Sequence, residues 1–147
     1  MLAVELPFYA ELTHEHESLF SQVLALERAL ALPPHERQDV FLATLRTLQE
    51  RLKQHFQFEE QGGYMAHVLQ QAPQLHRRVE ELLAEHQHMT RDLEALVDWT
   101  TAKAKGGSVP ADVGAPTRTW LLRVRAHEAA ENQLVQEACN RDCAEED

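Results

Sequence analysis

The amino-acid sequence predicts an all-α protein, folded as an up-down antiparallel four-helix bundle. In four separate runs of its 147 residues, apolar side chains recur at alternating steps of three and four, the spacing of one helix face. Segments with the proline or glycine residues that end helices separate these runs. No stretch shows the alternation of apolar and polar residues that is typical of strands. Because the connections are short, consecutive helices are expected to pack as antiparallel neighbours.

The first helix is predicted over residues 12–30 and the second over residues 41–59. The segment "ALPPHE" at 31–36 separates them, because proline lacks the backbone N–H that a helix interior needs. The second apolar stripe ends with His55 and Glu59 instead of apolar residues. Either group alone is costly to bury without a partner, so this stripe indicates a shared polar partner in the core.

Two glycines, Gly62 and Gly63, follow the second stripe. Each lowers the stability of a helix by about 1 kcal/mol relative to alanine. They leave three interpretations open: a kink in the helix, an early helix end, or space for a small ligand next to the polar pair.

The third helix is predicted over residues 75–96, after the break "QQAPQ" at 70–74. The fourth is predicted over residues 120–138, after the longer break "AKGGSVPADVGAP" at 104–116. Each of these two stripes again carries a histidine at a position that the spacing assigns to the core.

Composition limits the class of protein. We expect one domain over residues 1–147, because a 16.8 kDa chain with 44% hydrophobic residues can bury a core. A net charge of -10 argues against nucleic acid, whose phosphates require lysine and arginine. No apolar run approaches the ~18 residues of a membrane helix, and the start lacks the basic region of a secretory signal. Cys139 and Cys143 are interpreted as free thiols in a reducing cytoplasm.

Residues that could bind a metal occupy core positions of all four stripes. Along the chain a histidine is followed by a His-x-x-x-Glu pair, and the same order repeats 70 to 72 positions later. The candidate metal ligands are His16, His55, Glu59, His86, His127 and Glu131. In an antiparallel pair that turns near Pro73, Glu59 and His86 are expected at about the same level.

The other five of the 9 histidines are predicted to lie at the surface: His14, His35, His67, His76 and His88. The pair His76 and Glu80 also has the His-x-x-x-Glu spacing, but it lies one step off the third stripe. We interpret it as a solvated pair beside the core. His14 or His88 would replace its neighbouring stripe histidine only if the helical register were shifted.

Metal binding is a physical reason to bury these groups together. Four imidazoles and two carboxylates without partners would be costly in an apolar core. Imidazole and carboxylate oxygen suit iron, and also zinc or manganese. Because one carboxylate can bridge two cations, the two glutamates favour a dinuclear site. For one buried histidine a hydrogen-bonded structural role is the commoner explanation, but the joint pattern on four stripes favours a metal.

These motifs resemble those of the hemerythrin-like (HHE cation-binding) family, over residues 8–140. The matching segments are "EHES" with His16, "HFQFEE" with His55 and Glu59, "EHQH" with His86, and "HEAAE" with His127 and Glu131. The resemblance implies a hemerythrin-like bundle that holds a di-iron centre, two non-haem irons with an oxo or hydroxo bridge. It further implies that the four histidines are terminal ligands and that the two glutamates bridge the irons.

Two departures separate the chain from the oxygen-carrying members of that family. The carriers have a second histidine four residues from the third-helix histidine, where this chain has Leu82 and Thr90. They also space the last pair as His-x-x-x-x-Asp, where this chain has His-x-x-x-Glu. After Glu60, where many relatives continue into Phe-Pro, this chain reads "QGGYMAHV", so Tyr64 is expected near the site.

Three functions follow from these observations. The resemblance implies a metal-binding protein that binds or senses a small ligand such as O2, peroxide or nitric oxide. A second interpretation is an iron-responsive or iron-handling module without small-molecule chemistry. A third is a metal-free helical protein whose acidic face contacts a protein partner. The sequence leaves open which of them applies and whether the protein is an enzyme.

Overall fold

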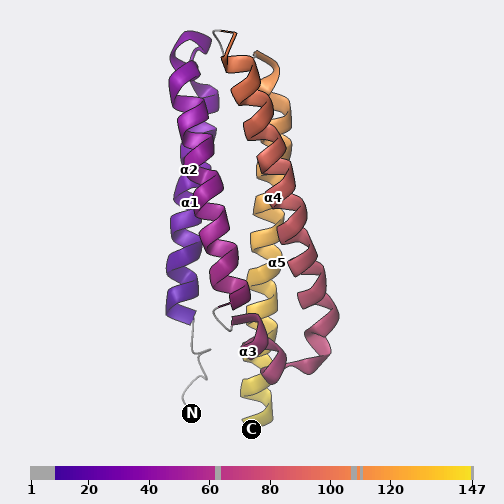
Figure 1. Cartoon of the computed structure of the whole chain (residues 1–147). Helices are drawn as coiled ribbons and strands as arrows, with labels where there is room; N and C mark the ends of the chain where they lie inside the picture. The colour runs from indigo at the N-terminus through magenta and orange to yellow at the C-terminus, as the bar shows by residue number, and fades with distance from the viewer. Residues whose placement is uncertain (1–8, 62–63, 107–108, 110, 147) are drawn as a thin grey trace.

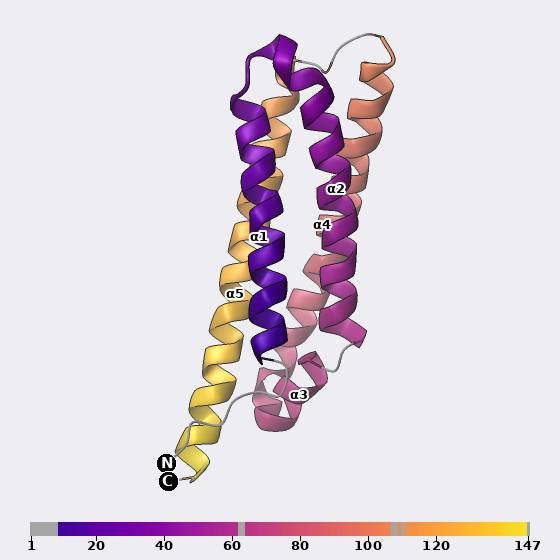
Figure 2. The same cartoon turned by 90° about the vertical axis from the view of Figure 1, so that its left-hand side faces the viewer.

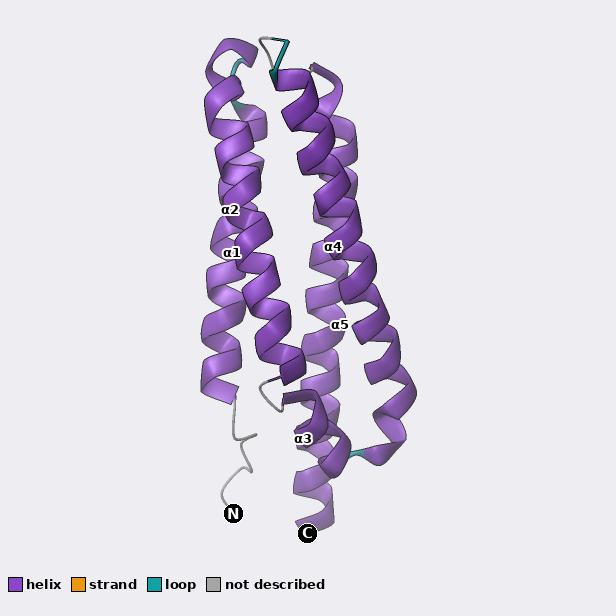
Figure 3. Cartoon of the chain, in the orientation of Figure 1, coloured by secondary structure: helices purple, strands orange, loops and turns teal. Residues whose placement is uncertain are grey.

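A computed structural model describes residues 9–61, 64–106, 109 and 111–146. Its helices are α1 (Tyr9–Ala31), α2 (Pro34–Gln61), α3 (Tyr64–Gln71), α4 (His76–Ala104) and α5 (Gly114–Glu146), with short 3-10 turns at Pro73–Leu75 and Ala111–Val113. The four long helices form an up-down antiparallel bundle, and the described residues contain no strand (Figure 1, Figure 3). The predicted fold class is therefore confirmed.

The turn between α1 and α2 is built around the two prolines that the sequence places there. Pro34 is the first residue of α2, a position where the missing N–H of proline costs no helical hydrogen bond. The carbonyl of Pro33 accepts hydrogen bonds from the backbone N–H groups of Glu36 and Arg37, both at 2.9 Å. This closed turn makes α1 and α2 adjacent and antiparallel.

The short helix α3 was not predicted. The structure ends α2 at Gln61 and starts a separate helix at Tyr64, while Gly62 and Gly63 lie outside the described residues. In Figure 2, α3 lies across the end of the bundle, below the ends of α1 and α2. It buries Met65 and Val68 in a cluster with residues of α4 and α5. This helix therefore covers the end of the core that α2 does not reach.

The apolar core consists of two clusters, one toward each end of the bundle. The upper cluster, on the side of the turn between α1 and α2, includes Leu26, Leu45 and Leu93. The lower cluster includes Val68 of α3 and Leu134 of α5. Between them lies a layer of buried histidines and glutamates. The stripes thus pack as predicted, and the polar residues in them meet at one level.

Among the described residues, no helix is both long and apolar enough to cross a bilayer.

Candidate metal centre

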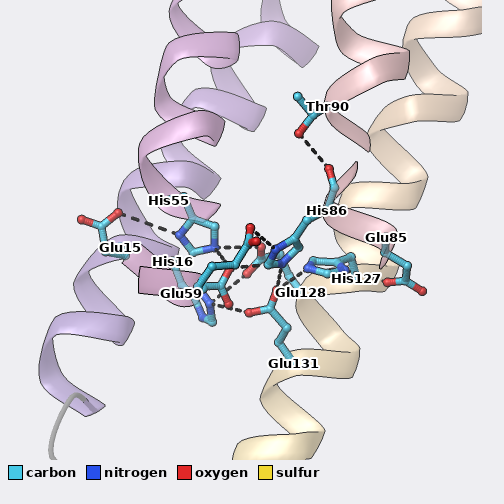
Figure 4. A network of polar contacts seen from close by, with 11 residues as sticks. Glu15, His16, His55, Glu59, Glu85, His86, Thr90, His127, Glu128 and Glu131 are labelled. Atoms are coloured by element: carbon cyan, nitrogen blue, oxygen red, sulfur yellow. Dashed lines mark hydrogen bonds and ion pairs between the residues drawn. The ribbon is translucent and has the colours of Figure 1, made fainter. Parts of the chain in front are cut away.

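The polar layer draws side chains from all four long helices. His16 comes from α1, His55 and Glu59 from α2, His86 from α4, and His127 and Glu131 from α5, so the structure brings together all six residues that the sequence singled out (Figure 4). Five of them are no more than 2% exposed, and His16 is the exception. The helical stripes put each of these side chains on the inner face of its helix.

One group of four residues could hold a first metal ion. It comprises His16, His55, Glu128 and Glu131, whose nearest donor atoms all lie within 4.8 Å of one another. His16 Nε2 lies 3.1 Å from a carboxylate oxygen of Glu128 and 3.5 Å from one of Glu131. His55 Nε2 lies 3.3 Å from Glu128. The group therefore offers two imidazoles and two carboxylates.

A second group could hold another ion next to the first. It comprises Glu59, His86, His127 and Glu131, all four of them buried. His86 Nε2 lies 3.6 Å from Glu59 and 3.5 Å from Glu131, and His127 Nε2 is in close contact with Glu131. The contact between Glu59 and His86 agrees with the equal height expected across the turn near Pro73. Glu131 belongs to both groups, as a bridging carboxylate would.

Glu128 is a site residue that the sequence reasoning missed. Glu128 lies one position past His127, off the apolar stripe from which the ligands of this helix were predicted. Its carboxylate nevertheless lies between His16 and His55, because α5 packs beside α1 at this level. The available signal was the adjacent pair "HE" within the segment "HEAAE".

Three further carboxylates were also missed, and they contact the outer nitrogens of the buried histidines. Nδ1 of His127 lies 2.6 Å from Glu85, and Nδ1 of His86 lies 3.1 Å from Glu60. Nδ1 of His55 lies 3.8 Å from Glu15. The two shorter contacts, at His127 and His86, favour a proton on Nδ1 and leave Nε2 free to bind a metal, and metal-bound histidines usually have this kind of partner.

The carriers' additional histidine has no counterpart at this centre. Leu82 is buried in the lower apolar cluster. Thr90 is exposed, and its hydroxyl donates a hydrogen bond of 2.7 Å to the backbone carbonyl of His86 (Figure 4). Neither residue extends the set of metal-binding groups.

Buried polar atoms without a hydrogen-bond partner concentrate in this layer. Among the described residues they include Nε2 of His16, His55 and His127, both carboxylate oxygens of Glu59 and Glu128, and one oxygen of Glu131. Many of these atoms approach one another closely without the geometry of a hydrogen bond. An unsatisfied buried polar group costs free energy, and a cation would satisfy several of these at once. The donor set therefore fits a metal.

Burial and charge shift the pKa values of these groups in opposite directions. Burial alone lowers the pKa of His55, but contacts with Glu128 and Glu59 outweigh it and raise the pKa to about 10. Burial, together with repulsion from His127 and His55, lowers the pKa of His86 to about 3. Burial raises the pKa of the Glu128 carboxyl, but its contact with His55 and the neighbouring imidazoles shift it below its usual value. Without a metal, the layer thus favours a protonated His55 and a neutral His86.

The histidines assigned to the surface lie there, with one partial exception. His14, His35, His76 and His88 are exposed. The side chains of His76 and Glu80 are 65% and 64% exposed and lie 2.9 Å apart, so this pair is solvated as predicted. His67 is only half-exposed, because α3, which was not predicted, packs against the bundle.

Three other residues singled out from the sequence remain without a structural test. Tyr64 opens α3, and Cys139 and Cys143 lie in α5. The side chains of all three lie outside the part of the chain that the structure describes.

The fold and this site define the chain as a helical-bundle protein built to bind metal. The family model of the hemerythrin HHE cation binding domain matches residues 8–139. The chain therefore belongs to the hemerythrin HHE family. Comparisons with curated proteins and with solved structures returned no match.

Proposed function

We propose that the chain holds two non-haem iron ions in this layer. His16 and His55 would bind one ion, and His86 and His127 the other. Glu59 and Glu131 would bridge them. The observation that carries this proposal is the membership of Glu131 in two donor groups that otherwise share no residue.

The number of donors supports two ions rather than one. A structural zinc site has four protein ligands, and the two groups together offer seven different residues. Imidazole and carboxylate in this proportion suit iron, which takes more donors than tetrahedral zinc. Two of the imidazoles, His86 and His127, also have an outer carboxylate within 3.1 Å of Nδ1, the arrangement that orients metal-bound histidines.

We further propose that this centre binds or senses a small ligand such as O2, peroxide or nitric oxide. Iron would supply the redox chemistry, and the protein's own residues would orient the imidazoles and exclude water. The two apolar clusters above and below the layer support this role, because they surround the centre with side chains that bind neither metal nor water. The single domain over residues 1–147, the cytoplasmic location and the absence of nucleic-acid binding remain predictions.

Metal analysis combined with absorption spectroscopy tests the proposal. Protein purified from iron-replete cells should contain about two iron atoms per chain. Its near-ultraviolet spectrum should change when the anaerobically reduced protein meets air, and nitric oxide should change the spectrum of the reduced form. A preparation that holds one zinc ion, or no metal, under these conditions overturns the di-iron assignment.

One observation favours an iron-responsive module as a second candidate. Each donor group contains side chains from three of the four long helices, so two ions there would together connect all four. Circular dichroism of the iron-loaded and chelator-treated protein separates the two functions. A large loss of helicity after iron removal favours the iron-responsive module. A bundle that keeps its helicity favours ligand binding at a preformed centre.

A further inference from the structure

A groove between α1 and α5 leads to one side of the metal centre. It has a volume of about 610 Å³. Leu19, Phe20 and Leu24 line it from α1, and Asn132 lines it from α5. His16 and Glu128 also form part of its wall. Its lining also includes the charged residues Glu17 and Arg28, and it reaches two residues of the first donor group.

The same two residues are the partly exposed members of that group. The side chain of His16 is 16% exposed and that of Glu128 is 17% exposed. The side chains of His55 and Glu131 are fully buried. Of the three carboxylates in the two donor groups, Glu128 is thus the one that is partly exposed to solvent.

Two other hollows approach the centre, but a carboxylate stands beside the imidazole in each. One is lined by His86 and Glu60, and the other by His127 and Glu85. In both, the carboxylate contacts Nδ1, the nitrogen that would face away from the metal. In the α1–α5 groove, Glu128 instead lies next to Nε2 of His16 and of His55.

The internal repeat shows that Glu128 breaks the symmetry of the site. The residue 72 positions earlier, equivalent to Glu128 in the other half, is Phe56. Its ring stacks on His86 with a centroid distance of 3.8 Å. In the first half of the repeat, the position beside the centre is thus occupied by the ring of Phe56, which cannot bind a metal. In the second half, the equivalent position is occupied by the carboxylate of Glu128.

We propose that Glu128 is a terminal ligand of the metal beside His16 and His55, and that its side chain blocks the inner end of the α1–α5 groove and can be displaced from it. When Glu128 moves aside or is removed, small monovalent anions such as formate reach that metal through the groove. Formate carries the same carboxylate group that Glu128 places there, so the exchange replaces one oxygen ligand by another. This inference rests on the proposed metal centre.

The decisive experiment is chemical rescue of an alanine variant. In the iron-loaded protein, Glu128→Ala should release iron to a chelator at least about tenfold faster than the wild type. The loss of a ligand should weaken metal binding at least as much as the loss of a carboxylate that only orients a ligand, which is about tenfold or more. Added formate should slow that release back toward the wild-type rate, because the removed side chain leaves space for it. In the matched control, Glu59→Ala, formate should change nothing, because Glu59 is fully buried.

A second pair of variants tests the route itself. Ser21 lines the α1–α5 groove and Ala126 lines the hollow beside His127, and both are exposed. In the Glu128→Ala background, Ser21→Trp should slow the action of formate severalfold, and Ala126→Trp should not. Glu128→Gln, whose amide fills the same space, should release iron faster than the wild type and should not respond to formate.

Each outcome decides the proposal. Wild-type rates in a folded Glu128→Ala protein that holds two irons would show that Glu128 is not a ligand, and the proposed function would stand. Equal rescue of the Glu59 variant, or no rescue of the Glu128 variant, would refute the groove as the route. If Glu128→Ala does not fold, an unchanged release rate in Glu128→Gln would refute the ligand role. A wild-type protein without metal would refute both this inference and the proposed function.

Discussion

Glu85 on α4 lies 2.6 Å from Nδ1 of His127 on α5. The sequence predicted His127 as a metal ligand, but it did not predict Glu85 as its partner. The contact orients the imidazole with Nε2 toward Glu131. It also favours the tautomer in which Nδ1 carries the proton.

We predict that Glu85→Gln lowers metal affinity by about 10- to 100-fold, as the loss of an outer partner of a metal-bound histidine commonly does. The amide keeps the shape of the side chain but weakens the acceptor for Nδ1–H. Titration with a competing chelator measures the change. The matched control is Glu80→Gln, at an exposed position paired with His76, and its affinity should equal that of the wild type. Equal losses in the two variants would rule out a specific role for Glu85.

Replacement of Glu131 should affect both metal positions, because its carboxylate belongs to both donor groups. We expect Glu131→Ala to retain less than half of the iron that the wild type binds. His76→Ala should bind the wild-type amount, since His76 lies on the surface. Metal analysis of the purified variants provides the measurement. If His76→Ala loses iron and Glu131→Ala does not, the proposed ligand set is wrong.

Metal removal should lower the melting temperature. A ligand that binds only the folded state stabilises it by mass action, and at a concentration 100 times its Kd this is about 2.7 kcal/mol. For a domain of this size, about 1 kcal/mol shifts the melting temperature by roughly 2–4 °C or more. Thermal melts of the iron-loaded and the chelator-treated protein test the expectation. Identical melting temperatures would show that the layer is equally stable without an ion.

The stability of the metal-free protein should be highest near pH 6.5. His55 has a raised pKa of about 10, so its stabilising contribution is complete below about 6.5 and is lost as the pH rises toward 10. His86 has a lowered pKa of about 3. Between about pH 6.5 and pH 3 its imidazole is protonated in the unfolded chain and neutral in the folded chain, so the folded state loses stability as the pH falls through this range. Stability therefore falls on both sides of this pH.

Denaturant unfolding of the metal-free protein at pH 4.5, 6.5 and 8.5 measures this dependence. We expect the largest free energy of unfolding at the middle value. His55→Gln should flatten the alkaline side, and it should also weaken the dependence on the acid side, because His55 helps to lower the pKa of His86. A stability that rises steadily from pH 4.5 to 8.5 would contradict the assigned protonation states.

The long helices and the residues of the inner layer were predictable because the spacing of residues within one helix is enough to identify its buried face. A stripe with steps of three and four defines the buried face of a helix, and His55 and Glu59 continue the stripe of α2 without interruption. His127 and Glu131 do the same on α5. Since all four stripes face one axis, their polar members were expected in the core, and the turn near Pro73 placed Glu59 and His86 at one level.

The tertiary structure alone decided the remaining partners. Glu128 and Glu85 each lie one position from a stripe residue, on the flank of the helix, and each contacts a histidine of a different helix. Spacing along one chain segment identifies the face on which a residue lies, but it does not identify the helix that packs against that face. The start of α3 at Tyr64 was undetermined for a related reason, since glycines permit a kink or an end equally. The sequence by itself therefore determined the bundle and the inner residues of its polar layer, and helix packing decided which carboxylates complete that layer.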